Sequence, residues 1–179
     1  LNPGCQVDHM LVLEGPQGMY KSSLLRALSV QDEWFNDDIA VLGDKDAKLA
    51  LHGRWIIEVK ELEAMNKAEI GGIKKFIDTR VDKIRLPYGK VVRDFPRRSI
   101  LAGTYNPTGK GYLKDASGGR RFWPVVINKH ADIEGMERVR DQLWAEATVA
   151  YLAGEKWWTH DAELQALLKE EQTLRYQRH

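Results

Sequence analysis

The sequence predicts an α/β domain in which helices flank a central parallel sheet, followed by a helical segment at the C-terminal end. Apolar segments at 10–13, 55–62 and 99–103 are typical of buried strands, and segments of helical periodicity lie between them. A length of 179 residues suits one domain with a small appendage. We therefore expect a core over 1–130 and a helical segment over 131–179 packed on it.

The composition excludes several classes of protein. Apolar residues make up 43% of the chain and charged residues 30%, which suits a globular protein with a polar surface. No apolar run approaches the roughly 20 residues that a membrane helix needs. The single cysteine, Cys5, excludes an internal disulfide and fits a reducing compartment, so we expect a cytoplasmic protein. Because the chain does not begin with Met, we expect it to be part of a longer protein.

The loop between the first strand and the helix expected at 21–28 has the features of a phosphate site. Free N–H groups and the dipole at a helix start attract anions. Of the P-loop pattern G-x-x-x-x-G-K-[ST], Gly15, Lys21 and Ser22 match, whereas Tyr20 stands at the second glycine and Gly18 lies two residues earlier. The alternative is an ordinary strand–turn–helix corner with an exposed lysine. We predict that ATP and Mg²⁺ bind to Gly15, Pro16, Gln17, Gly18, Met19, Tyr20, Lys21, Ser22 and Ser23.

Two carboxylates lie near the end of the strand predicted from residue 55. In an open α/β sheet, ligands bind at the carboxyl ends of the strands. A carboxylate beside a phosphate loop can hold Mg²⁺ and polarise the attacking water. We favour Glu61 as the catalytic group, with Glu58 in support, and the residues alone leave open which of them touches the metal. The alternative is a pair of solvated glutamates.

A helix is predicted at 44–52 with Asp44 as its cap, and a second helix at 66–78. In the second, Asn66 followed by Glu69 forms the spacing of a capping box. Its expected buried face comprises Ile70, Ile73, Phe76 and Ile77.

The segment 79–98 predicts a basic β-hairpin, because apolar residues alternate on both sides of a turn at 87–89. Seven of its residues are basic and two acidic, although the net charge of the whole chain is only +1. Basic side chains with an aromatic ring at a protruding tip suit backbone contacts and base stacking on nucleic acid, and the alternative is a solvated hairpin face. We predict DNA contacts from Lys83, Arg85, Tyr88 and Lys90.

The second half of the chain supplies a polar amide and two arginines. Asn106 follows the strand at 99–103, where it can sense a γ-phosphate, although an Asn-Pro pair is more often a turn. Arg120 and Arg121 precede the strand predicted to 127 and could reach the phosphate of a neighbouring subunit, or form an ordinary surface pair. We expect helices over 132–154 and at the end of the chain to pack through apolar faces, and the six tryptophans to lie in the core. The histidines lack the spacing of metal ligands.

Together these features resemble the virulence-associated E family over nearly the whole chain. The resemblance also rests on Gly103-Thr-Tyr-Asn106, Tyr112-Leu-Lys-Asp115, Gly119-Arg-Arg-Phe-Trp-Pro124 and Leu143-Trp-Ala-Glu-Ala147. That family occurs in phages, prophages and mobile elements, often beside or fused to a primase. It is similar to superfamily 3 helicases, an AAA+-type branch of the P-loop NTPases. The resemblance therefore implies an AAA+-like P-loop fold, a bacterial host cell and a ring of several copies of the chain, expected to be a hexamer.

The resemblance also implies a role for each candidate residue. Lys21 and Ser22 would bind the β/γ-phosphates and Mg²⁺, Glu58 and Glu61 would form the acidic Walker B element, and Asn106 would be the sensor. Arg120 or Arg121 would be the arginine finger that acts in trans, with Arg121 preferred because it directly precedes its strand. Many relatives carry glycine where this chain has Tyr20.

These residues support one main hypothesis and two alternatives. The leading hypothesis is a DNA-stimulated ATPase, the helicase motor of a phage or mobile-element replication protein. The first alternative is a nucleic-acid-binding module with a degenerate, non-hydrolysing P-loop, which Tyr20 suggests. The second is a terminase-like packaging or partner-loading ATPase.

Overall fold

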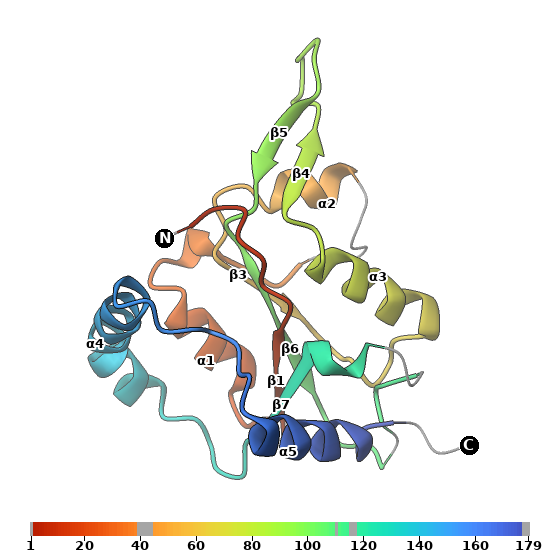
Figure 1. Ribbon diagram of the computed structural model, residues 1–179, viewed down its shortest axis with the longest axis vertical. Helices are drawn as coiled ribbons and strands as arrows, with labels where there is room; N and C mark the ends of the chain where they lie inside the picture. Colours follow the sequence, from red (N-terminus) through yellow and green to blue (C-terminus); the bar gives the residue numbers. More distant parts are fainter. Residues whose placement is uncertain (1, 39–44, 110, 115–117, 177–179) are drawn as a thin grey trace.

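The computed structural model describes residues 2–38, 45–109, 111–114 and 118–176 (Figure 1). Its centre is a five-stranded sheet in the order β2-β3-β6-β1-β7, and all of its strands run parallel. The strands are β1 (Met10–Glu14), β2 (Phe35–Asn36), β3 (Ile56–Val59), β6 (Ile100–Tyr105) and β7 (Phe122–Val126). The predicted α/β class with a central parallel sheet is therefore confirmed.

Helices cover both faces of this sheet. On one face, α1 (Lys21–Leu28) packs against Leu13, Phe35 and Ala102, and α4 (Ile133–Leu152) lies outside α1. On the other face, α3 (Lys67–Ile77) closes the larger core around Met10, Val12 and Ile57. The remaining helices are η1 (Asp32–Trp34), α2 (Lys45–Ala50), η2 (Gly119–Arg121) and α5 (Ala162–Thr173), of which α5 packs against η2 and β7.

The capping signal at α3 is confirmed in detail. The Asn66 side chain accepts hydrogen bonds from the backbone N–H groups of Ala68 and Glu69 at 2.9 and 3.0 Å. The Glu69 carboxylate in turn accepts from the Asn66 N–H at 2.6 Å, which completes the capping box. The predicted apolar face of the helix is buried. Asp44 and Asp115, by contrast, lie outside the described residues.

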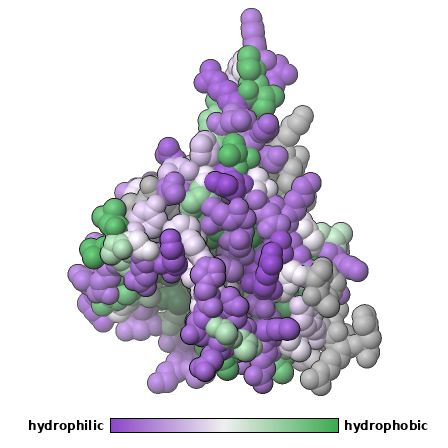
Figure 2. All heavy atoms as spheres, viewed as in Figure 1, coloured by the Kyte–Doolittle hydropathy of each residue, from purple (hydrophilic) through white to green (hydrophobic). Residues whose placement is uncertain are grey.

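The predicted hairpin is also present, as β4 (Val81–Ile84) paired antiparallel with β5 (Arg93–Pro96). It projects from the body of the molecule as a narrow arm (Figures 1 and 2). The guanidinium of Arg97 donates to both carboxylate oxygens of Asp82, at 2.6 and 2.9 Å, and lies 3.8 Å from the ring centre of Phe76. Because it is nearly buried there, Arg97 anchors the base of the hairpin and adds nothing to its exposed charge.

The C-terminal helices contact the core, but their apolar faces are less buried than expected. No residue of α4 is buried, and Leu164, Leu167 and Leu174 of the last helical segment are 46%, 59% and 61% exposed. The short α1 offers too little surface to cover an apolar stripe as long as that of α4. The six tryptophans, expected in the core, are likewise at most partly buried. None of the described helices has the length and apolar character needed to cross a membrane.

Candidate functional site

The carboxyl ends of β1, β3 and β6, which are adjacent in the sheet, bring the candidate polar residues together. Lys21 and Ser22 begin α1, directly after the loop that leaves β1, while Glu58 belongs to β3 and Asn106 follows β6. A cavity of about 270 Å³ at this edge is lined by Gln17, Gly18, Met19, Tyr20, Lys21, Ser22, Ser23, Lys60, Glu61, Thr104 and Asn106. This edge is where ligands bind in open α/β sheets.

The backbone of the loop explains its glycines. A Cβ atom on Gly15 would lie 2.6 Å from the carbonyl oxygen of Ile127, so a larger residue there would force the two segments apart. Gly18 has φ +85°, a conformation that side chains disfavour. Both residues are therefore required by the path of the chain.

Tyr20 has a left-handed backbone conformation, which glycine adopts without strain. Its φ and ψ of 59° and 30° lie in the left-handed region, which costs a residue with a side chain about 1–2 kcal/mol. The residue is 56% exposed, and its ring packs edge-on against His130, with ring centres 5.5 Å apart. The loop thus keeps a glycine-like path despite the bulky side chain.

Lys21 connects the loop to β6. Its buried ammonium donates to the carbonyl oxygens of Gly15 and Pro16 at 2.6 and 2.9 Å, and to Oδ1 of Asn106 at 2.9 Å. Burial lowers the pKa of Lys21, and the negative charges of Glu63 and Glu58 oppose that shift. Lys21 and Asn106, 85 residues apart in sequence, are therefore in direct contact.

Glu58 is the most deeply buried acid of the site, with 2% exposure. Its Oε1 accepts hydrogen bonds from the hydroxyls of Ser22 at 2.6 Å and Thr104 at 2.9 Å. Its Oε2 is buried and has no hydrogen-bond partner among the described residues. A buried, unpaired carboxylate oxygen is costly, and a cation would satisfy it. The residues present therefore fit Mg²⁺, which would be held by Glu58 and the Ser22 hydroxyl.

No cluster of three or more His, Cys, Asp or Glu side chains suited to a metal occurs in the described part of the chain. Magnesium does not require such a cluster, because it usually binds through one or two carboxylates together with waters and substrate phosphates. Glu58 and Ser22 are thus an adequate protein contribution.

Glu61 and Glu63 have different positions at the site. Glu61 is exposed, lines the cavity and has a left-handed φ of 54°. Glu63, which sequence reasoning missed, accepts from the Asn106 amide Nδ2 at 2.7 Å and from its backbone N–H at 3.2 Å. Thr104 was missed as well. The signal for Glu63 was present as a third carboxylate after Glu58 and Glu61, and that for Thr104 as a hydroxyl at the end of a buried strand.

The two arginines lie at the opposite end of the sheet. Phe122, which follows them, pairs with Met10 at the start of β1, so neither arginine reaches the candidate phosphate loop at 15–20 of its own chain. Arg121 donates to both oxygens of Asp78 at 2.8 and 2.9 Å, and that hydrogen bonding raises its pKa. The Arg120 side chain is exposed and makes no hydrogen bond or ion pair within the described ranges. The geometry thus leaves Arg120, rather than the preferred Arg121, available to another molecule.

The predicted DNA contacts are all exposed on the hairpin. Tyr88 at the tip is fully exposed with φ 62°, and the Arg85 Nε donates to the Gly89 carbonyl at 2.7 Å. Lys83 and Lys90 complete the set. Since β5 leads directly into the start of β6, this arm also stands at the amino end of the sheet, away from the phosphate loop.

Comparison with known proteins gives one family and many similar solved structures, two of which are described below. None of the curated proteins matches the chain. The two structures are both of the apo A form of the NrS-1 C-terminal region and are 18% identical to this chain, with TM-scores of 0.49 and 0.48. They cover 95% and 96% of this chain, which spans only 36% of each of them. A family model described as the virulence-associated protein E-like domain matches residues 1–177, and the chain therefore belongs to the virulence-associated protein E-like family.

Proposed function

We propose that this chain is an Mg²⁺-dependent ATPase that drives movement on single-stranded DNA, the helicase-type motor of a phage or mobile-element replication protein. One observation carries the proposal: Oε2 of the Glu58 carboxylate is buried and unpaired, while Oε1 accepts a hydrogen bond from the Ser22 hydroxyl. Ser22 directly follows Lys21 in the sequence. Lysine, hydroxyl and carboxylate at the start of a helix form the minimum set for a nucleotide phosphate with its cation.

The residues would divide the work as follows. Lys21 would leave the loop carbonyls to bind the β/γ-phosphates. Asn106, already in contact with Lys21, would report whether the γ-phosphate is present. Glu61, exposed in the cavity, would orient the attacking water. Bound Mg²⁺ would neutralise charge that develops on the phosphates. In phosphoryl transfer, such positioning and charge stabilisation supply nearly all of the catalysis.

An arginine must then come from a second copy of the chain. Both arginines lie at the far end of the sheet from their own phosphate loop, which suits a ring in which each copy completes its neighbour's site. We assign this role to Arg120, because Arg121 is held by Asp78. A trans arginine contributes roughly 10³–10⁵ in rate, so hydrolysis per chain should rise steeply with protein concentration.

The test is ATP hydrolysis with and without single-stranded DNA for the native protein, Lys21→Ala, Glu58→Gln and the control Lys169→Ala. Lys169 is an exposed lysine of α5, distant in sequence from every site residue. We expect DNA to stimulate the native protein, the two site variants to lose at least about 100-fold in rate, and the control to keep the native rate. Native rates in Lys21→Ala would refute the proposal.

A second candidate function is a DNA-binding module that does not hydrolyse ATP. The strained backbone of Tyr20 and the commitment of the Lys21 ammonium to loop carbonyls favour it. It predicts salt-sensitive DNA binding that the triple variant Lys83→Ala, Arg85→Ala, Lys90→Ala abolishes, together with no measurable ATP affinity. Titration of a fluorescent ATP analogue decides between the two functions, because only the ATPase binds it.

A further inference from the structure

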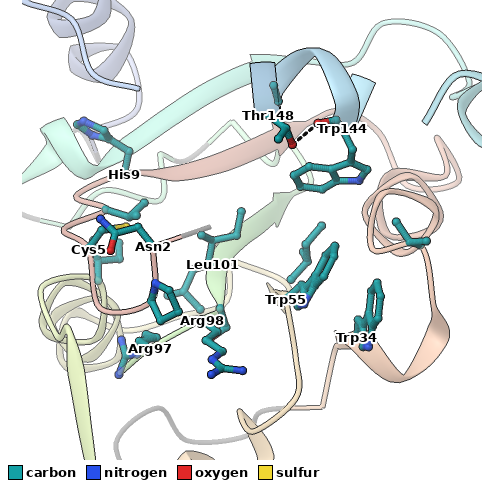
Figure 3. A pocket seen from close by; sticks show the side chains of 18 of the residues that line it. Asn2, Cys5, His9, Trp34, Trp55, Arg97, Arg98, Leu101, Trp144 and Thr148 are labelled. Atoms are coloured by element: carbon teal, nitrogen blue, oxygen red, sulfur yellow. Dashed lines mark hydrogen bonds between the residues drawn. The ribbon is translucent and has the colours of Figure 1, made fainter. Parts of the chain in front are cut away.

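A second and larger cavity lies at the amino ends of β3 and β6, at the opposite end of the sheet from the phosphate loop. Its volume of about 780 Å³ is within the roughly 300–1,000 Å³ typical of ligand sites. Three tryptophans from separate parts of the chain line it: Trp34 from η1, Trp55 just before β3, and Trp144 from α4 (Figure 3). The ATPase site uses none of them.

The three indoles form a fixed aromatic wall. Trp34 stacks on Trp55 with ring centres 4.0 Å apart, and Trp144 meets Trp55 at 5.9 Å in an edge-to-face arrangement. The Trp144 Nε1 donates to the Leu28 carbonyl at 2.9 Å, which sets the orientation of its ring. Trp55 and Trp144 nevertheless remain 39% and 36% exposed. Their rings are therefore preorganised to receive another planar group.

The cavity also carries an available positive charge. Arg98 lines it, is exposed and has no hydrogen-bond or ion-pair partner in the described part of the chain. It lies in the segment between β5 and β6, so it connects the cavity to the basic hairpin. The acid among the lining residues, Asp141, accepts a hydrogen bond from Arg140 at 3.2 Å, which offsets its charge.

We propose that this cavity receives an unpaired base of single-stranded DNA, stacked against Trp55 and Trp144, with the adjoining phosphate on Arg98. The inference rests on the proposed function, which supplies single-stranded DNA as the ligand of the hairpin. Stacking on aromatic rings accepts any base, and cations along the path hold the backbone. An apolar protein segment would use the rings but would gain nothing from Arg98 or from continuity with the hairpin.

The test compares binding of a short oligothymidylate with binding of an abasic oligonucleotide of equal length, which keeps the phosphates and lacks the bases. Fluorescence anisotropy gives the affinities, and quenching of tryptophan fluorescence reports stacking. The variants are Trp144→Leu and Arg98→Gln, with Trp158→Leu as the matched control, because its ring contacts lie within 156–160, away from the cavity. Arg98→Gln alters an exposed, unpaired side chain, so it tests the proposal even if Trp144→Leu folds poorly.

We expect the native protein to bind oligothymidylate about 5- to 150-fold more tightly than the abasic strand, with quenching by the former alone. Trp144→Leu should lose most of that preference. Arg98→Gln should reduce the magnitude of the slope of log affinity against log salt by about one. The control Trp158→Leu should change neither the preference nor the slope. Equal affinity for the two strands, or native behaviour in both variants, would overturn the proposal and favour a protein ligand. If Lys21→Ala still abolished ATP hydrolysis in that case, the proposed ATPase function would stand and only the base-binding inference would fail.

Discussion

The ion pair between Glu14 and Arg175 gives the most decisive test of how the C-terminal segment supports the candidate phosphate loop at 15–20. Arg175 donates to the Glu14 carboxylate at 2.8, 3.0 and 3.1 Å, and it also bonds the backbone carbonyl and the side chain of Glu171. The Tyr112 hydroxyl donates to Oε1 of the same Glu14 carboxylate at 3.0 Å. Glu14 directly precedes Gly15, so this pair ties the end of the chain to the residue that begins the loop.

Arg175→Met should destabilise the protein by about 3 kcal/mol. Removing one partner of a buried pair costs roughly 3–5 kcal/mol, because the remaining charge stays buried without compensation. The side chains here are 11% and 7% exposed, which places the cost at the lower end of that range. The measurement is the free energy of unfolding in urea, with the m-value checked for constancy.

The control is Arg138→Met, which removes a cation whose partner Asp132 is 3.9 Å away, with both side chains largely exposed. It should cost at most about 1 kcal/mol. Adding Glu14→Gln to Arg175→Met should recover part of the loss, because the buried charge is then gone while an acceptor for Tyr112 remains. If Arg175→Met cost no more than Arg138→Met, the reasoning about a buried pair would be refuted.

Three further changes test other parts of the structure. Tyr20→Gly should stabilise the protein by up to about 1 kcal/mol in urea unfolding, because relief of left-handed strain exceeds the extra conformational entropy that glycine loses on folding. A destabilised variant would show that the ring contact with His130 contributes more than the strain costs. Asn66→Ala should cost about 1 kcal/mol through loss of the α3 cap, and Asn66→Asp, which keeps an acceptor, should cost less; equal losses would contradict the capping argument. Burial lowers the pKa of His9, so the unfolded chain binds its proton more readily. Above the unfolded pKa, which is near 6.5, His9 is neutral in both states and does not lower the free energy of unfolding. Below that pH, the free energy of unfolding declines by at most about 1.4 kcal/mol per pH unit, because the unfolded chain takes up the proton. His9→Gln should flatten that decline in urea unfolding measured between pH 7 and pH 5, and an unchanged profile would exclude His9 as its source.

Local sequence was sufficient for the secondary structure that frames the site. The helix at Lys21–Leu28, the capping box at Asn66 and the hairpin each follow from neighbouring residues, and the structure has all three. Such features depend on spacing over a few positions, which a sequence displays directly.

Contacts between distant segments were decided by the tertiary structure. Ser22 and Glu58 meet because β1, β6 and β3 are neighbours in the sheet, and that strand order is not written in any local pattern. The same holds for the ion pair that engages Arg121 and for the Glu63 carboxylate on Asn106. Apolar periodicity marked candidate packing faces on the C-terminal helices, but only the assembled fold determines whether a surface exists to cover them. The sequence by itself thus determined the local elements and the residue types of the candidate phosphate site. The packing of the sheet decided which side chains share that site, because proximity between distant residues depends on topology.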